Sequence, residues 1–102
     1  MAQDEVMNLS KAYANAVRGM MDTKGIFLYG SYVKGTARED GDIDIAVIAV
    51  IVDRVPGDYL NAVSKLWGLT RTVGDAIEPV LLTEQDNQSH FIETVDRTGI
   101  AI

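Results

Sequence analysis

The sequence of 102 residues contains no cysteine, which excludes a disulfide framework and a zinc site built on cysteine. Positive charge is scarce: nine Lys and Arg stand against fifteen Asp and Glu, giving a formal net charge of −6. This balance argues against an extended nucleic-acid footprint, which needs clustered cations. The longest apolar run, residues 43–52, is too short to span a bilayer, and no targeting signal opens the chain. We therefore expect a cytoplasmic protein with no membrane association.

Apolar residues make up 47% of the chain, enough to build a packed core. A chain of this length is close to the smallest that folds without disulfides or metal staples. We expect a single domain over residues 1–102, without repeats or linkers.

Apolar spacing and turn residues predict an alternation of helices and strands. Helices are expected at residues 4–23, 31–37, 59–73 and from 83 to about 97, and strands at 26–29, 43–52 and 76–82. Asp58 is the expected N-cap of the third helix, whose buried face would include Leu60 and Trp67. Pro79 cannot donate a ladder hydrogen bond, so we expect its strand at a sheet edge. Residues 100–102 are expected to form a short apolar tail.

Asp42 and Asp44 open the longest apolar run and alternate with Ile43. Alternate residues of a strand share a face, so the carboxylates would lie side by side and repel each other unless a cation lies between them. Mg²⁺ prefers such oxygen ligands. A solvated pair on an exposed face is the alternative reading. An EF-hand is excluded because Ile45 and Ile51 stand where its loop needs Gly and Glu.

Gly30 and Ser31 end an apolar strand and could open a helix, whose free N–H groups favour phosphate. The alternative is an ordinary strand-to-helix turn with a serine cap. The stretch 30–36 is not a P-loop, because Thr36 follows Gly35 directly and the required lysine is missing.

Taken together, Gly30-Ser31, Gly35-Thr36-Ala37-Arg38 and Asp42-Ile43-Asp44 resemble the signature of the DNA polymerase β-like nucleotidyltransferases. The order and spacing are most similar to the small stand-alone prokaryotic members, the minimal nucleotidyltransferases. Gly41 is a departure, since the family usually has Ser before the first Asp. The resemblance implies an α+β nucleotidyltransferase fold, with a small mixed β-sheet packed against helices.

The resemblance also implies Mg²⁺-dependent transfer of a nucleoside monophosphate from an NTP, with ATP favoured, to a hydroxyl acceptor. Asp42 and Asp44 would hold two Mg²⁺ ions, and Glu78, where the family more often has Asp, would complete the nucleophile-side ion. Asp75 is the fallback ligand. Gly30, Ser31, Gly35 and Arg38 form the implied nucleotide-binding set, although Arg38 could equally be a loop charge or a partner of the acids.

Small family members often act with a helical HEPN-type protein, so such a partner is implied by analogy. The alternative function is a non-catalytic antitoxin or nucleotide-binding module that acts by binding that partner. A homo-oligomer also stays open. Of the remaining residues, we interpret His90 as structural. Trp67 is interpreted as core, with a base-stacking platform as the alternative, and Lys34, Lys65 and Arg71 as solvated helix residues, with phosphate contacts as the alternative.

Overall fold

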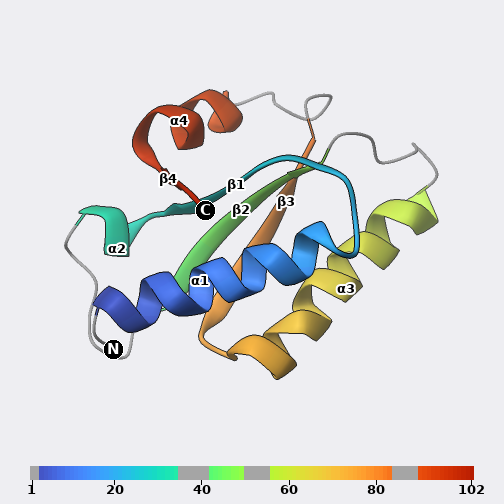
Figure 1. The fold of residues 1–102 in the computed structure, drawn as a ribbon. Helices are drawn as coiled ribbons and strands as arrows, with labels where there is room; N and C mark the ends of the chain where they lie inside the picture. The colour runs from blue at the N-terminus through green and yellow to red at the C-terminus, as the bar shows by residue number, and fades with distance from the viewer. Residues whose placement is uncertain (1–2, 35–41, 50–55, 84–89) are drawn as a thin grey trace.

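The computed structural model describes residues 3–34, 42–49, 56–83 and 90–102, and shows helices packed against a β-sheet (Figure 1). The elements in chain order are α1 (Gln3–Arg18), β1 (Thr23–Tyr29), α2 (Ser31–Lys34), β2 (Ile43–Ala49), α3 (Pro56–Val73), β3 (Ile77–Leu82), α4 (Phe91–Thr98) and β4 (Ile100–Ala101). None of the helices in these ranges is long and apolar enough to cross a membrane.

The described strands form one sheet in the order β3-β2-β1-β4. β2 runs parallel to β3, while β1 is antiparallel to both β2 and β4. The sheet is therefore mixed, which confirms the predicted fold class. β3 lies at one edge, as Pro79 predicted, because a residue without an N–H leaves no donor unused there.

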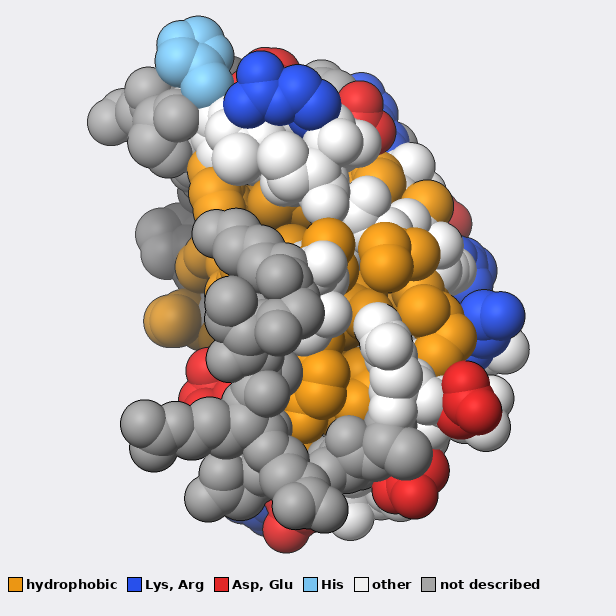
Figure 2. Space-filling model, turned by 90° about the vertical axis from the view of Figure 1, so that its left-hand side faces the viewer, with side chains coloured by type: hydrophobic (Ala, Val, Ile, Leu, Met, Phe, Trp, Pro, Cys, Tyr) orange, Lys and Arg blue, Asp and Glu red, His pale blue; other side chains and the backbone are white. Residues whose placement is uncertain are grey.

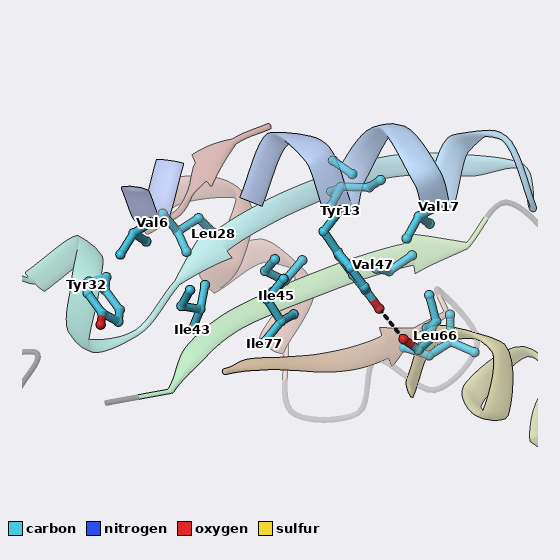
Figure 3. Packing of buried hydrophobic residues seen from close by; sticks show 13 residues of the cluster. Val6, Tyr13, Val17, Leu28, Tyr32, Ile43, Ile45, Val47, Leu66 and Ile77 are labelled. Atoms are coloured by element: carbon cyan, nitrogen blue, oxygen red, sulfur yellow. Dashed lines mark hydrogen bonds between the residues drawn. The ribbon is translucent and has the colours of Figure 1, made fainter. Parts of the chain in front are cut away.

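The core lies between one face of the sheet and the helices α1 and α3 (Figure 3). Every second residue of each long strand points into it, following the two-residue period of a strand. The Tyr13 hydroxyl of α1 donates a buried 2.7 Å hydrogen bond to the Leu66 carbonyl oxygen of α3, which ties the two helices together. The buried apolar set comprises Val6, Tyr13, Ala14, Val17, Ile26, Leu28, Tyr32, Ile43, Ile45, Val47, Leu66, Ile77 and Leu81.

Helix α4 packs against the opposite face of β1, and the chain end that follows α4 lies beside β1 in the sheet. Tyr29 and Phe91 of α4 meet edge to face, with ring centroids 5.5 Å apart. After α4 the chain forms β4, in which Ile100 pairs with Leu28 and Ala101 with Phe27. The Ile102 N–H continues this pairing to the Ile26 carbonyl oxygen at 2.9 Å. The expected apolar tail is thus a sheet strand, too short for its alternation to be read from sequence.

The first helix is shorter than predicted. It ends at Arg18, where the Met20 and Met21 N–H groups both donate to the Val17 carbonyl oxygen and close the last turn. β1 consequently starts at Thr23, three residues before the start predicted for this strand. The last part of the predicted second strand, residues 50–52, lies outside the described residues.

Two helix starts also differ from prediction. α3 begins at Pro56, a residue suited to the first helical position because no intrahelical partner is needed for the missing N–H there. Asp58 therefore lies within the helix, and its prediction as N-cap is wrong. α4 begins at Phe91 and not near Thr83, because His90 has a left-handed backbone, with φ of 54°, that no helix can continue through.

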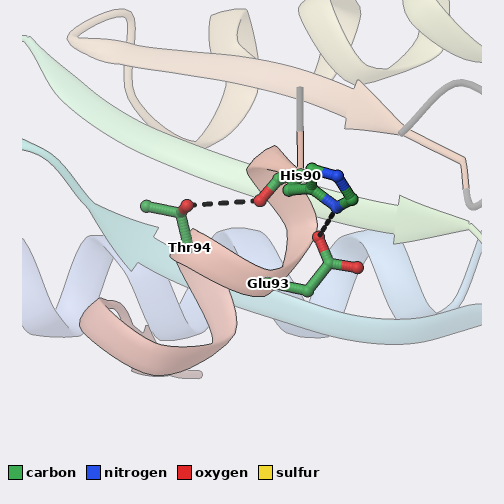
Figure 4. A network of polar contacts seen from close by, with 3 residues as sticks. All are labelled: His90, Glu93 and Thr94. Atoms are coloured by element: carbon green, nitrogen blue, oxygen red, sulfur yellow. Dashed lines mark hydrogen bonds and ion pairs between the residues drawn. The ribbon is translucent and has the colours of Figure 1, made fainter. Parts of the chain in front are cut away.

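His90 has a local structural role at this helix start (Figure 4). Its carbonyl oxygen accepts hydrogen bonds from the N–H and the hydroxyl of Thr94, each 3.2 Å long. Its Nδ1 lies 3.7 Å from the Glu93 carboxylate, and both side chains are exposed.

The predicted buried face of α3 is partly wrong. Leu66 is buried, but Trp67 is 46% exposed and Leu60 is 63% exposed. Both apolar side chains lie on the outside of the helix, so Trp67 is not a core residue.

Candidate functional site

The end of β1 and the starts of β2 and β3 meet at one end of the sheet, beside α2 (Figure 1). The Ile43 N–H donates a 2.8 Å hydrogen bond to the Ala76 carbonyl oxygen, which aligns the first residues of β2 and β3. Figure 2 views the molecule from this side and shows a band of hydrophobic side chains with acidic and basic side chains around its margin.

The strand register places Tyr29, Asp44 and Glu78 in one row across the sheet. Tyr29 pairs with Asp44 across the antiparallel ladder, and Asp44 pairs with Glu78 across the parallel one. Their neighbours Leu28, Ile43 and Ile77 are buried in the core, so the row lies on the opposite face of the sheet. Asp44 is half-buried and Glu78 is exposed.

Asp42 lies just before β2, is exposed, and joins this row through its charge and one hydrogen bond. Glu78 shares a side-chain hydrogen bond with Asp42, and this bond is the main reason that the pKa of Glu78 is raised. Burial and the charges of Asp42 and Asp44 raise that pKa further. The pKa of Asp44 is raised mainly by burial and then by the charge of Asp42. The acids therefore disfavour one another's ionised forms, as carboxylates do when they share a site.

Tyr29 belongs to the same cluster and was not predicted. Burial raises the pKa of its phenol, and the negative charges of Asp44 and Glu78 raise it further. Its ring contacts Phe91 edge-on, so α4 abuts the acidic row through this pair. Its position directly before Gly30 and one residue after the buried Leu28 is the sequence signal that could have identified it.

Gly30 is the point at which the turn and the acids touch. It has φ of +80°, a conformation that favours glycine. A Cβ at this position would overlap Oδ2 of Asp44. The absence of a side chain at Gly30 is therefore what leaves room for the Asp44 carboxylate.

The other predicted site residues are described only in part, lie outside the described residues, or lie exposed on turns and helices. Ser31 begins α2, and only its backbone is described. Gly35 and Arg38, with the departure Gly41, lie outside the described residues. Asp75, the fallback ligand, is exposed in the turn before β3, and Lys65 and Arg71 are exposed on α3.

A divalent cation suits the chemistry of this donor set, because it would neutralise carboxylates that otherwise repel one another. In the part of the chain that the structure describes, no group of three or more His, Cys, Asp or Glu side chains lies close enough together to hold one metal ion. The assignment of Asp42, Asp44 and Glu78 as ligands stays a prediction from the sequence.

The comparisons with known proteins agree with the fold. The family model described as polymerase beta, nucleotidyltransferase matches residues 13–102. No curated protein matches the chain. Among solved structures, a candidate nucleotidyltransferase from Sulfolobus solfataricus is similar with a TM-score of 0.69 and 18% identity, over 97% of this chain and 80% of that one.

Two further similar structures are toxin–antitoxin assemblies. One was solved with AMP-PNP and matches with a TM-score of 0.52 and 20% identity, over 99% of this chain and 72% of that one. The other is a MntA–HpeT mutant with two Asp-to-Glu substitutions, with a TM-score of 0.51 and 18% identity over the same shares. At these identities the likeness shows a shared fold.

Proposed function

Because the chain belongs to the polymerase beta nucleotidyltransferase family, we propose that it transfers a nucleoside monophosphate from an NTP, with ATP the first candidate, to a hydroxyl acceptor. The observation that carries this proposal is the row of Asp44 and Glu78 across β2 and β3, with Asp42 beside it and Gly30 against Asp44. A carboxylate cluster at a glycine turn is the arrangement that metal-dependent phosphoryl chemistry needs.

In this proposal Asp42 and Asp44 hold both Mg²⁺ ions, and Glu78 helps to hold the ion on the acceptor side. When bound, Mg²⁺ neutralises phosphate charge and lowers the pKa of a hydroxyl that it contacts. The carboxyl groups must be ionised to act as ligands, so metal binding and protonation of the cluster compete with each other. The pKa values of Asp44 and Glu78 are raised because the cluster favours an added positive charge, and this charge can come from a proton or from a cation.

The turn supplies the second half of the proposed site. The backbone of Gly30 and Ser31, with Gly35 and Arg38 further along, would contact the triphosphate. Gly30 contributes by having no side chain, which keeps the Asp44 carboxylate open on the side of the turn. Phosphates would then bind directly beside the acids.

The acceptor that we propose lies on a partner protein of the HEPN type, in the cytoplasm. Similarity to toxin–antitoxin assemblies, one of them solved with the ATP analogue AMP-PNP, supports both the partner and the choice of ATP. The same similarity favours one alternative, a non-catalytic antitoxin or nucleotide-binding module that acts by binding such a partner. The exposed Glu78, where the family more often has Asp, keeps that alternative in view.

The two functions are separated by a labelling experiment. The purified chain is incubated with Mg²⁺, ATP radiolabelled on its α-phosphate, and extract of its native cells. We expect a labelled protein band with the wild-type chain and none with the double variant Asp42→Asn, Asp44→Asn.

Asp96→Asn, which removes an exposed acid on α4, is the matched control and should label normally. If the wild type forms a stable complex with a protein from the extract but labels nothing, the catalytic proposal fails and the binding function is supported.

A further inference from the structure

Helix α3 exposes two large apolar side chains, Leu60 and Trp67, on a face that is not used in the core. Leu60, Ser64, Trp67, Gly68 and Arg71 follow one another at spacings of four, three, one and three residues, which places them along one side of the helix. We call these five residues the outer stripe. Leu60 is 63% exposed and Trp67 is 46% exposed, whereas Leu66 on the other side is buried. α3 therefore offers apolar surface in two directions.

A shallow groove lies along the outer stripe and extends to one side of it. Its lining residues are Val63, Ser64, Trp67, Gly68, Thr70 and Arg71. Gly68 faces open space in this groove, since a Cβ there would meet nothing within 4 Å. Glycine is unfavourable inside a helix, and no packing neighbour in the described structure requires it at this position. What the missing side chain provides is room for something to approach the helix closely beside the Trp67 ring.

The charges around the groove are basic on a chain that is acidic overall. Arg71 lies in the outer stripe and Lys65 at its margin, both are exposed, and within the described residues neither forms an ion pair. The whole chain has a formal net charge of −6. A second copy packing the same stripe by two-fold symmetry would bring like charges together. Two cations are also too few for a nucleic-acid footprint.

We propose that the outer stripe is a docking surface for an amphipathic helix of a partner protein whose apolar residues are flanked by Asp or Glu. Leu60 and Trp67, seven residues apart, match the spacing at which such a helix presents its anchors. Gly68 admits one apolar side chain of the partner into the groove, and Arg71 and Lys65 pair with its acids. This surface lies on α3, and the proposal does not depend on nucleotide transfer.

Trp67 provides the test, because it is the only tryptophan in the chain. The full chain is titrated with two helical peptides that contain no aromatic residues. Both peptides carry Leu at their own positions one, four, five and eight, which form one apolar helix face. One has Glu at the flanking positions and the other has Lys. We expect the Glu peptide to shift Trp67 emission to shorter wavelength and to bind at least about tenfold more tightly than the Lys peptide, since the flanking charges then attract.

Charge reversal sharpens the test. Arg71→Glu should weaken the binding of the Glu peptide and strengthen the binding of the Lys peptide. Lys11→Glu, the same change on the exposed side of α1, should alter the affinity for neither peptide. Circular dichroism of both variants verifies that they are folded.

The proposal is overturned if neither peptide shifts the emission or if both bind equally. It is also overturned if Trp67 emission shifts with concentration of the chain alone, which would assign the stripe to a second copy. If a single-stranded oligoadenylate quenches Trp67 emission and binds more tightly than the Glu peptide, the outer stripe is a nucleic-acid surface.

Discussion

At the scale of single residues, the candidate site depends on the contact between Gly30 and Asp44. The turn and the acid come from β1 and β2, and they are brought together by the pairing of Tyr29 with Asp44 in the sheet. A side chain at position 30 would displace the carboxylate that the proposed chemistry needs, and it would also occupy a left-handed backbone conformation. The turn therefore needs glycine at position 30 to leave space for the Asp44 carboxylate, and its backbone is also a candidate phosphate contact.

Gly30→Val should affect both binding and stability. A β-branched residue at positive φ costs on the order of 1–3 kcal/mol of folding free energy, and its Cβ overlaps Asp44 Oδ2. We expect loss of Mg²⁺-ATP binding by calorimetry together with a lower melting temperature. Gly68→Ala, a change at a helical glycine with free space around it, is the control and should melt no lower than wild type. Unchanged Mg²⁺-ATP affinity in Gly30→Val would show that the turn is not part of the site.

For single residues, the sheet face on which Asp44 lies could be predicted from the sequence, but the exposure of Trp67 could not. Strand alternation places Asp44 opposite Ile43 and Ile45 whatever the strand packs against, so its face was predictable. The meeting of Glu78 with Asp42 needed the register of β2 against β3, which the resemblance to a known family supplied and the composition did not. Trp67 lies next to the buried Leu66, and hydrophobicity alone cannot tell which of two adjacent apolar residues faces the core.

At the scale of elements, a buried hydrogen bond from Tyr13 to the Leu66 carbonyl oxygen connects α1 and α3. Burial strongly raises the pKa of the Tyr13 phenol, so the group stays protonated as the donor to Leu66. Long-range contacts of this kind, and the pairing of β4 with β1, are what the sequence left unpredicted. They join residues far apart in the chain, whereas periodicity reports only on local structure.

Tyr13→Phe should destabilise the domain by about 1–2 kcal/mol, because the ring packing is kept while the buried Leu66 carbonyl loses a donor. Urea denaturation of the chain measures this change. Ser10→Ala on the same helix is the matched control. Its hydroxyl is buried and has no hydrogen-bond partner in the described structure, so its removal should leave stability equal or higher. A loss in Ser10→Ala as large as that in Tyr13→Phe would contradict this account of the interface.

At the scale of the whole molecule, the acidic cluster links folding to pH. The pKa of Asp44 is higher in the folded state than its ordinary value, so the folded protein binds its proton more tightly than the unfolded chain. The contribution of Asp44 to the stability of the metal-free protein should therefore be fully present below the ordinary carboxyl pKa and be lost as pH rises through the raised value. When its carboxyl groups are ionised, the cluster is a source of repulsion that a cation can relieve.

Asp44→Asn tests this linkage and the catalytic assignment together. Removal of one negative charge relieves the repulsion with Asp42, so the metal-free variant should melt at the same temperature as wild type or higher at neutral pH, and its melting temperature should vary less with pH. A ligand that binds only the folded state stabilises it by RT ln(1 + [L]/Kd), or about 2.7 kcal/mol at a hundredfold excess over Kd. Wild type should gain this increment from Mg²⁺-ATP, and Asp44→Asn should gain little.

The measurement is a thermal melt of both proteins across the acidic to neutral range, with and without Mg²⁺-ATP. If Asp44 were instead a structural acid with a required partner, its removal would lower stability in the absence of metal, because that partner would be left buried and unmatched. A variant that melts lower without metal and still gains the full increment from Mg²⁺-ATP would exclude Asp44 as a ligand. Charge repulsion in a metal site predicts that metal-free Asp44→Asn melts at the same temperature as wild type or higher, whereas a structural role predicts that it melts lower. The sign of the change in melting temperature therefore decides between the two roles.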